Sequence, residues 1–223
     1  MSKLLRAVAD DDKKLRRQSI LQAAAELFAE DSRQLPSVIS IAKACGLAKG
    51  TVYLYFKTKE GIFLALLSQY FQSWFEQGLQ AMAVMQADGC TALKDQIPRL
   101  LTVLVDYLEN NPEFMQLASM NHSIIEKNLD NDVAYQFKKE LLDLSIQMGN
   151  AVEQLIPALP KGEGVLLLRR TYALTIGIWQ LSDWPDAMVD AFGEDEFQVL
   201  RPKFADEARL AVMQLWIGAA QLG

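Results

Sequence analysis

Hydrophobic side chains recur along most of the chain at the spacing of an α-helix. Near the N-terminus one such set consists of Ile20, Ala24, Leu27 and Phe28. Residues three and four positions apart lie on the same face of a helix, whereas a half-buried strand would alternate apolar and polar positions. Few segments of this chain alternate in that way. The pattern therefore predicts an all-α protein.

Short groups of turn-forming residues interrupt the helical pattern. They fall at residues 32–36, 45–47, 57–58, 86–89, 110–112, 155–164 and 184–202. These interruptions divide the chain into about nine predicted helices. A long helical pattern over residues 63–82 follows several short ones, and we place a domain boundary within it.

Residues 38–56 predict two short helices joined by a sharp corner at Gly46. Gly46 can adopt the left-handed conformation that ends a helix and redirects the chain. Ala42 is small where the second helix must cross close to the first. Ile41, Leu47 and Val52 are placed to fill the core between the two helices. This arrangement is typical of a helix-turn-helix motif.

The outward face of the second helix carries hydrogen-bond donors and aromatic rings, and it lacks the acidic residues that usually alternate with lysines on a solvated helix face. From its start this face consists of Ala48, Lys49, Gly50, Thr51, Tyr53 and Tyr55. Short side chains at a helix N-terminus can approach base edges in the major groove, and flanking hydroxyl groups can bond phosphates. Gly50 costs about 1 kcal/mol relative to Ala, which is easier to explain if DNA passes close by. Tyr55 can instead pack partly beneath the next helix, as we expect Phe56 to do fully.

A predicted helix starts at Lys59 with Thr58 as its N-cap. A cation in a first turn opposes the helix dipole unless an anion binds there. Free N–H groups, the Thr58 hydroxyl and the Lys59 ammonium together favour a phosphate site. Ser37, which caps the preceding motif, is a second candidate. The alternative for Lys59 is an ordinary solvated lysine beside Glu60.

Charge is distributed unevenly along the chain, whose formal net charge is −6. Residues 1–67 contain 11 Lys and Arg against 7 Asp and Glu, a net charge of +4, so the rest contains 11 against 21, a net charge of −10. Phosphate meets the local field rather than the global sum, so this division favours a nucleic-acid partner for the N-terminal part. A chance distribution is equally compatible with these counts.

Residues 41–60 read Ile-Ala-Lys-Ala-Cys-Gly-Leu-Ala-Lys-Gly-Thr-Val-Tyr-Leu-Tyr-Phe-Lys-Thr-Lys-Glu, after Ile-Leu-Gln-Ala-Ala-Ala-Glu-Leu-Phe-Ala-Glu at 20–30. Over about residues 15–67 the chain resembles the TetR family of bacterial regulators. The resemblance implies that the recognition-helix and following lysine positions approach DNA. It also implies an Ω-shaped homodimer and a repressor gated by a small-molecule effector.

Two departures from the family pattern fall within this region. The family often has a Gly-aromatic turn ending in a Thr that contacts phosphate, whereas residues 31–35 here are followed by Pro36 and that Thr is missing. The recognition helix often opens with Ser or Thr, and here opens with Ala48. We expect a flexible N-terminal arm at residues 1–12, a DNA-binding domain at 13–62, and a ligand-binding and dimerisation domain at 63–223.

Two apolar helical patterns close the chain, at residues 164–182 and 204–222. Paired with their symmetry mates they would form a four-helix interface, and otherwise they would belong to the core of the monomer. The candidate interface residues are Leu167, Leu174, Ile178, Leu181, Leu210, Met213 and Ile217. A two-fold dimer predicts a pseudo-palindromic double-stranded operator with half-sites about 34–36 Å apart.

The middle of the chain supplies aromatic, soft and polar side chains of the kind that line adaptable ligand sites. The candidates are Tyr107, Phe114, Met115, Met120, His122 and Trp179. Each of them could equally be ordinary core. The acidic body favours a neutral or cationic ligand, and we expect a small, largely apolar one.

Other classes of function find little support in the residues. One His and two Cys leave no expected metal site, cofactor or catalytic centre, so a helical enzyme is a remote alternative. A nearer alternative is a DNA-bound protein of the same fold controlled by a protein partner, which an exposed apolar patch would favour. We expect no membrane span, no signal peptide and a cytoplasmic location.

Overall fold

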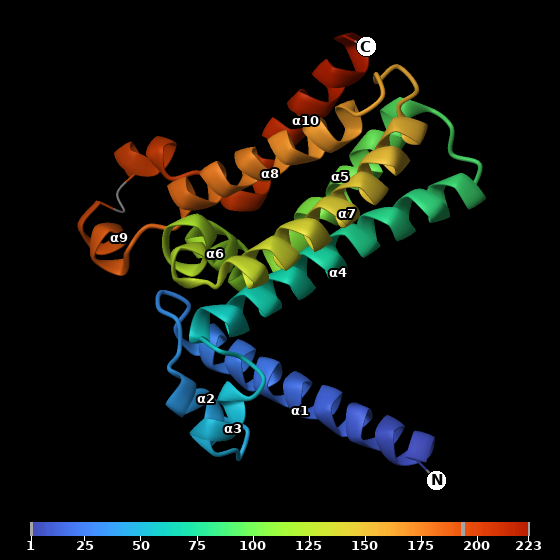
Figure 1. The fold of residues 1–223 in the computed structure, drawn as a ribbon. Helices are drawn as coiled ribbons and strands as arrows, with labels where there is room; N and C mark the ends of the chain where they lie inside the picture. Colours follow the sequence, from blue (N-terminus) through green and yellow to red (C-terminus); the bar gives the residue numbers. More distant parts are fainter. Residues whose placement is uncertain (1, 193–194, 223) are drawn as a thin grey trace. The chain divides into compact units, whose positions relative to one another are not determined.

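The computed structural model describes residues 2–192 and 195–222, and these form helices and connecting turns without a strand (Figure 1). The predicted all-α class is thereby confirmed. The helices are α1 (Ser2–Glu30), α2 (Val38–Ala44), α3 (Lys49–Tyr53), α4 (Lys59–Ala87), α5 (Leu93–Asn110), α6 (Pro112–Met120), α7 (Asn131–Leu155), α8 (Glu163–Ser182), α9 (Asp186–Phe192) and α10 (Phe204–Leu222). Three shorter segments are η1 (Asn121–Ile125), η2 (Glu126–Asn128) and η3 (Asp195–Leu200).

The chain divides into two compact units. The first comprises the residues up to Gln69 together with Gln116–Lys138, and the second comprises Tyr70–Met115 together with the residues from Lys139 onward. Helices α4, α6 and α7 contribute residues to both units.

The first unit is built around the apolar stripe of α1. Ile20, Ala24 and Phe28 are at most 1% exposed, as the helical spacing predicts, and Leu27 is half-buried. The Phe28 ring lies 5.6 Å from the ring of Phe63 on α4, in a tilted pair. Helix α2 packs against both α1 and α3. The short helices α2 and α3 therefore pack on a core whose side chains come largely from the longer helices.

The second unit is centred on α10, which packs against both α5 and α8. Val105 of α5, Ile178 of α8 and Ala208 of α10 form a buried cluster, on which Leu174 and Phe204 pack. Aromatic rings fill another part of this unit. Phe114 lies between Tyr70, Phe71, Trp74 and Tyr107, with ring centroids 5.0–6.1 Å away.

Residues 2–12, expected as a flexible arm, form the first part of α1, which contains no Gly or Pro. The structure differs from the sequence-based expectation at two places. The chain turns between η1 and α7, where Asp130 accepts a hydrogen bond from the Asp132 backbone N–H at 3.0 Å. Within residues 184–202, expected as a break, the seven-residue helix α9 forms, and none of its residues is buried.

Among the described residues, none of the helices combines the length and the apolar character that crossing a lipid bilayer requires.

Candidate nucleic-acid interface

The corner between α2 and α3 is made by Gly46, whose φ is +68°. The Leu47 N–H donates to the Ala42 carbonyl at 2.9 Å, and the Gly46 N–H donates to the Lys43 carbonyl at 3.3 Å. This pair of bonds is the Schellman arrangement, which satisfies the last carbonyls of a helix and needs a left-handed residue at its centre. The prediction of a left-handed corner at Gly46 is confirmed.

Helix α3 is fixed from one side only. Val52 is 0% exposed and packs into the core that Ile41 and Ala42 of α2 also fill. A helix of five residues would not persist without such an anchor, because nucleation of a helix is unfavourable. The burial of Val52 leaves the opposite face of α3 to solvent.

The outward face of α3 carries the predicted DNA-binding residues. Ala48, Lys49, Gly50 and Tyr53 are exposed, while Thr51 and Tyr55 are half-buried. The Lys49 ammonium lies 5.8 Å from the centre of the Tyr53 ring, a cation–π distance. A Cβ atom built on Gly50 would meet nothing within 4 Å, so packing inside the chain does not require a glycine there.

Two capped helix starts flank α3. The Gly61 N–H donates to the Thr58 hydroxyl oxygen at 3.1 Å at the start of α4, as predicted, and Lys59 beside it is half-buried. The Ser40 N–H donates to the Ser37 hydroxyl oxygen, also at 3.1 Å, at the start of α2. Remaining N–H groups at each start can bond an anion.

Several exposed cations of the first unit were not among the predicted DNA-binding residues. Lys43 lies in the last turn of α2, and Arg17 of α1 places its guanidinium 5.0 Å from the centre of the buried Phe56 ring. The Lys57 ammonium pairs with Asp130 at 3.4 Å across 73 positions of sequence. Sequence spacing alone gives no signal for the Lys57–Asp130 pair. The cluster of cations at Lys13–Arg17, in contrast, could have been recognised from the sequence.

The predicted ligand residues lie mainly in packed core. Phe114 and Met115 are at most 2% exposed, Met120 and Tyr107 are buried at 7% and 8%, and Trp179 is half-buried with its ring 5.3 Å from Phe204. The side chain of His122 lies outside the described residues. Of the other five residues, none lines either of the two cavities described for the chain.

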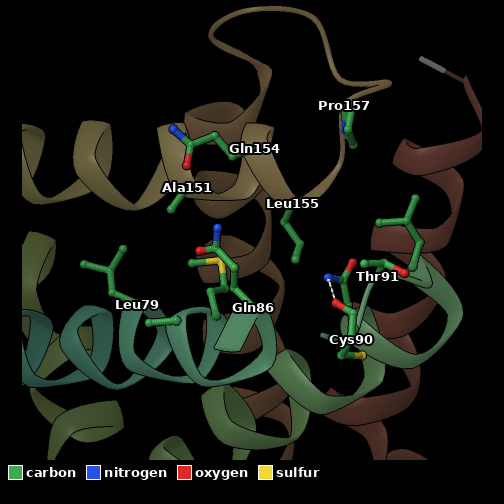
Figure 2. Close-up of a pocket in the computed structure, with 12 residues that line it drawn as sticks. Leu79, Gln86, Cys90, Thr91, Ala151, Gln154, Leu155 and Pro157 are labelled. Carbon is green, nitrogen blue, oxygen red and sulfur yellow. Dashed lines mark hydrogen bonds between the residues drawn. The ribbon is translucent and has the colours of Figure 1, made fainter. Parts of the chain in front are cut away.

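The larger of those cavities, of about 450 Å³, lies in the second unit, where the end of α4, the start of α5 and the end of α7 surround it (Figure 2). The smaller one, of about 410 Å³, is an open groove between α4 and α5 that includes Val84 and Arg99. Both volumes are within the range of small-molecule sites.

The predicted interface residues of α8 and α10 divide into two groups. Leu167 and Ile178 are 1% and 6% exposed and belong to the core of this chain. Leu181, Leu210 and Ile217 are 56%, 55% and 42% exposed. Leu174 and Met213 are half-buried.

Two short helices joined by a left-handed glycine, with the second helix anchored from within and open on its outer face, define a helix-turn-helix DNA-binding protein. The chain belongs to the TetR family of bacterial transcriptional regulators. Residues 20–66 match the model described as bacterial regulatory proteins, tetR family, and residues 69–221 match the tetracyclin repressor-like C-terminal domain.

Individual relatives agree with this assignment. The HTH-type transcriptional regulator YuxN of Bacillus subtilis is 32% identical over 98 residues, 44% of this chain and 32% of YuxN. The fatty acid metabolism regulator protein of the same organism is 41% identical over 58 residues, 26% of this chain and 30% of that protein. The chain thus spans about a third of the length of these relatives.

Solved structures show the same fold. The TetR-family repressor FadR of Thermus thermophilus, determined with lauroyl-CoA, is 20% identical with a TM-score of 0.56, covering 91% of this chain and 94% of that one.

Proposed function

We propose that this TetR-family regulator is a dimeric repressor that binds a pseudo-palindromic operator and is released by a small, largely apolar ligand. The observation that carries the DNA-binding part is the open outer face of α3, which Gly46 and buried Val52 fix outward. Lys49, Thr51 and Tyr53 are then the base-reading candidates, and Ser37, Tyr55 and Lys59 the phosphate contacts.

The exposed apolar side chains of α8 and α10 support the dimer. Leu181, Leu210 and Ile217 expose large apolar area on two neighbouring helices of the second unit. Gly177 and Gly218 on the same helices have open space around their Cβ positions, which would allow a partner helix to approach closely. A four-helix interface of two α8 and two α10 helices would bury these groups.

The cavity between α4, α5 and α7 supports ligand control. Lauroyl-CoA, bound by the Thermus neighbour, makes an acyl compound a reasonable class of effector to test.

A protein partner is the second candidate for control. Leu142 and Ile146 lie one turn apart on α7 and are 53% and 42% exposed, away from α8 and α10 in sequence. Such a pair is much smaller than a typical protein interface, so we place ligand control first.

The DNA-binding part is tested by fluorescence anisotropy on genomic fragments over a range of salt concentrations. Lys59→Ala should weaken binding to all sequences alike and lower the slope of log affinity against log salt by about 2 per dimer, because one phosphate contact is lost per subunit. Lys161→Ala, at an exposed lysine of the second unit, is the matched control and should change neither. Equal slopes of log affinity against log salt for the parent and Lys59→Ala would show that Lys59 does not contact DNA.

A further inference from the structure

The larger cavity has a wall that is fixed before any ligand arrives. Helix α4 ends in a second Schellman arrangement: the Cys90 N–H donates to the Met85 carbonyl at 3.0 Å, the Gly89 N–H donates to the Gln86 carbonyl at 3.2 Å, and Gly89 has a φ of +68°. The side-chain amide of Gln96 then donates to the Cys90 carbonyl at 2.6 Å. The turn from α4 into α5 is therefore held from both of its ends.

The lining of this cavity is apolar at its base and carries amides at its edge. Leu79, Met82, Leu93 and Leu155 are buried or half-buried. Gln86 and Gln154 are exposed residues on facing helices, and in Figure 2 Gln86 projects from α4 toward α7 while Leu155 projects from α7 toward α4. Since Gln96 is bonded to the backbone, Gln86 and Gln154 are the amides best placed to meet a ligand.

None of the twelve described lining residues is charged. A carboxylate or an ammonium group would find no counter-ion among these residues, and one that entered the apolar base of the cavity would also lose its hydration, which is strongly unfavourable. An amide or hydroxyl group would lose hydration too, but a glutamine amide can replace those hydrogen bonds with both a donor and an acceptor.

We propose that this cavity binds the effector and that the effector is an uncharged amphiphile, with an apolar body on the leucine and methionine side chains and an amide-like or hydroxyl group bonded to Gln86 and Gln154. This assignment rests on the proposed ligand-controlled regulator. The proposed effector site is distinct from the packed aromatic residues around Phe114. The charge of the head group then decides which acyl compounds bind.

A series of ten-carbon probes tests the charge selection. Decanamide and decanol are neutral, decanoate is an anion, decyltrimethylammonium is a cation, and decanoyl-CoA is a polyanion. The neutral pair should raise the Tm of the full chain and weaken its binding to operator DNA, and the three charged probes should do neither at equal concentration. The proposal would be overturned if only the charged probes raised the Tm, or if no probe of the series raised it.

Two glutamine variants locate the site. Gln86→Leu and Gln154→Leu should each weaken decanamide binding about tenfold, since each removes one hydrogen-bonding partner. Gln80→Leu is the matched control, because Gln80 lies on the same helix as Gln86 but lines the groove between α4 and α5 instead. Equal decanamide affinity in Gln86→Leu, Gln154→Leu and the parent would show that the ligand binds elsewhere.

The measurement of operator binding distinguishes failure of the ligand proposal from failure of the proposed function. If the parent binds operator DNA and a charged probe releases it, the ligand class proposed for the cavity is wrong while the regulator stands. If the parent binds no DNA in the absence of probes, the proposed function itself fails.

Discussion

A single buried hydroxyl joins α8 to α10 inside the second unit. Thr171 is 2% exposed, and its hydroxyl oxygen accepts a hydrogen bond from the Trp216 indole N–H at 2.8 Å while the hydroxyl donates to the Leu167 carbonyl at 2.9 Å. Thr171→Val keeps the shape but leaves the indole donor without an acceptor. We expect the free energy of unfolding in urea to fall by about 1–3 kcal/mol. Thr171→Ser is the control and should retain most of that energy; a Val variant as stable as the parent would contradict this account of the bond.

The phenol of Tyr70 should make the fold sensitive to alkaline pH. Burial first, and then the charge of Glu113 and the neighbouring Tyr107, raise the pKa of Tyr70 from 10.0 to about 12. Between those two values the unfolded chain has lost a proton that the folded chain still holds, so stability must fall as pH rises and is fully present below pH 10.

Urea unfolding at pH 9 and pH 11 measures this effect. The parent should lose more stability between the two pH values than Tyr70→Phe does, because phenylalanine has no proton to lose. Equal losses in the two proteins would show that Tyr70 is not responsible.

Individual residues differ in how far the sequence could predict them. Gly46 and Thr58 were predictable because a left-handed corner and an N-cap each depend on local chemistry. The six expected ligand residues stay a prediction, since apolar side chains line cavities and fill cores alike, and Phe114 is packed among four rings. Gln86 and Gln154 look in the sequence like ordinary exposed helix residues, and only the contact of distant helices brings them to one cavity.

At the scale of elements, an ion pair joins the loop after α3 to the start of α7 within the first unit. Lys57 and Asp130 are both exposed, so the pair is weak. It nevertheless engages the Lys57 ammonium, which lies beside the candidate DNA-binding face. Hydrogen bonds from Asp132 and Lys57 lower the pKa of Asp130, so the pair persists at neutral pH.

Asp130→Asn should strengthen operator binding about 1.5- to 5-fold, because it frees Lys57 for phosphate. Asparagine can still accept the hydrogen bond from the Asp132 N–H, so the start of α7 should be preserved. Anisotropy titrations of Asp130→Asn, Lys57→Ala and the double variant form a cycle. A gain that survives in the double variant would mean that Lys57 does not mediate it.

The long elements were predictable, and so were the short α2 and α3 because of the glycine corner between them, whereas α9 and η1 were not. Helices α5, α8 and α10 carry apolar stripes that a helical period detects, and α10 indeed packs on the other two. Helix α9 has seven residues and η1 is a π-helix of five residues, so each is too short for a helical period to identify it. The turn before α7, at Asn-Leu-Asp-Asn 128–131, lies outside the predicted breaks, although these residue types favour turns and caps.

At the scale of the whole molecule, the proposed dimer depends on the exposed side chains of α8 and α10. A chain of 25.0 kDa should sediment as a dimer of about 50 kDa. Leu210→Glu should shift it toward the monomer, since a charge would have to be buried in an apolar interface. Leu142→Glu on α7 is the control and should stay dimeric. Loss of the dimer in the control alone would move the interface to α7.

The charge division visible in the sequence matches the two roles proposed. The basic residues of the N-terminal 67 positions fall in the unit that holds α3, and the acidic excess falls mostly in the rest of the chain. The family could be predicted from residues 15–67 because the spacing around Gly46 is specific. The cavity proposed for the effector could not be predicted, because it depends on tertiary packing that local patterns do not encode.

Selection of binding sites from random double-stranded DNA tests the central claim most directly, with the parent and Lys49→Ala compared in parallel. If α3 reads bases from each subunit of a dimer, the parent will enrich a pseudo-palindrome with half-site centres about one helical turn, 10–10.5 base pairs, apart or a multiple of it. Lys49→Ala will relax preference at the same position in both half-sites. An identical consensus from the two proteins, or no enrichment by the parent, would contradict the account.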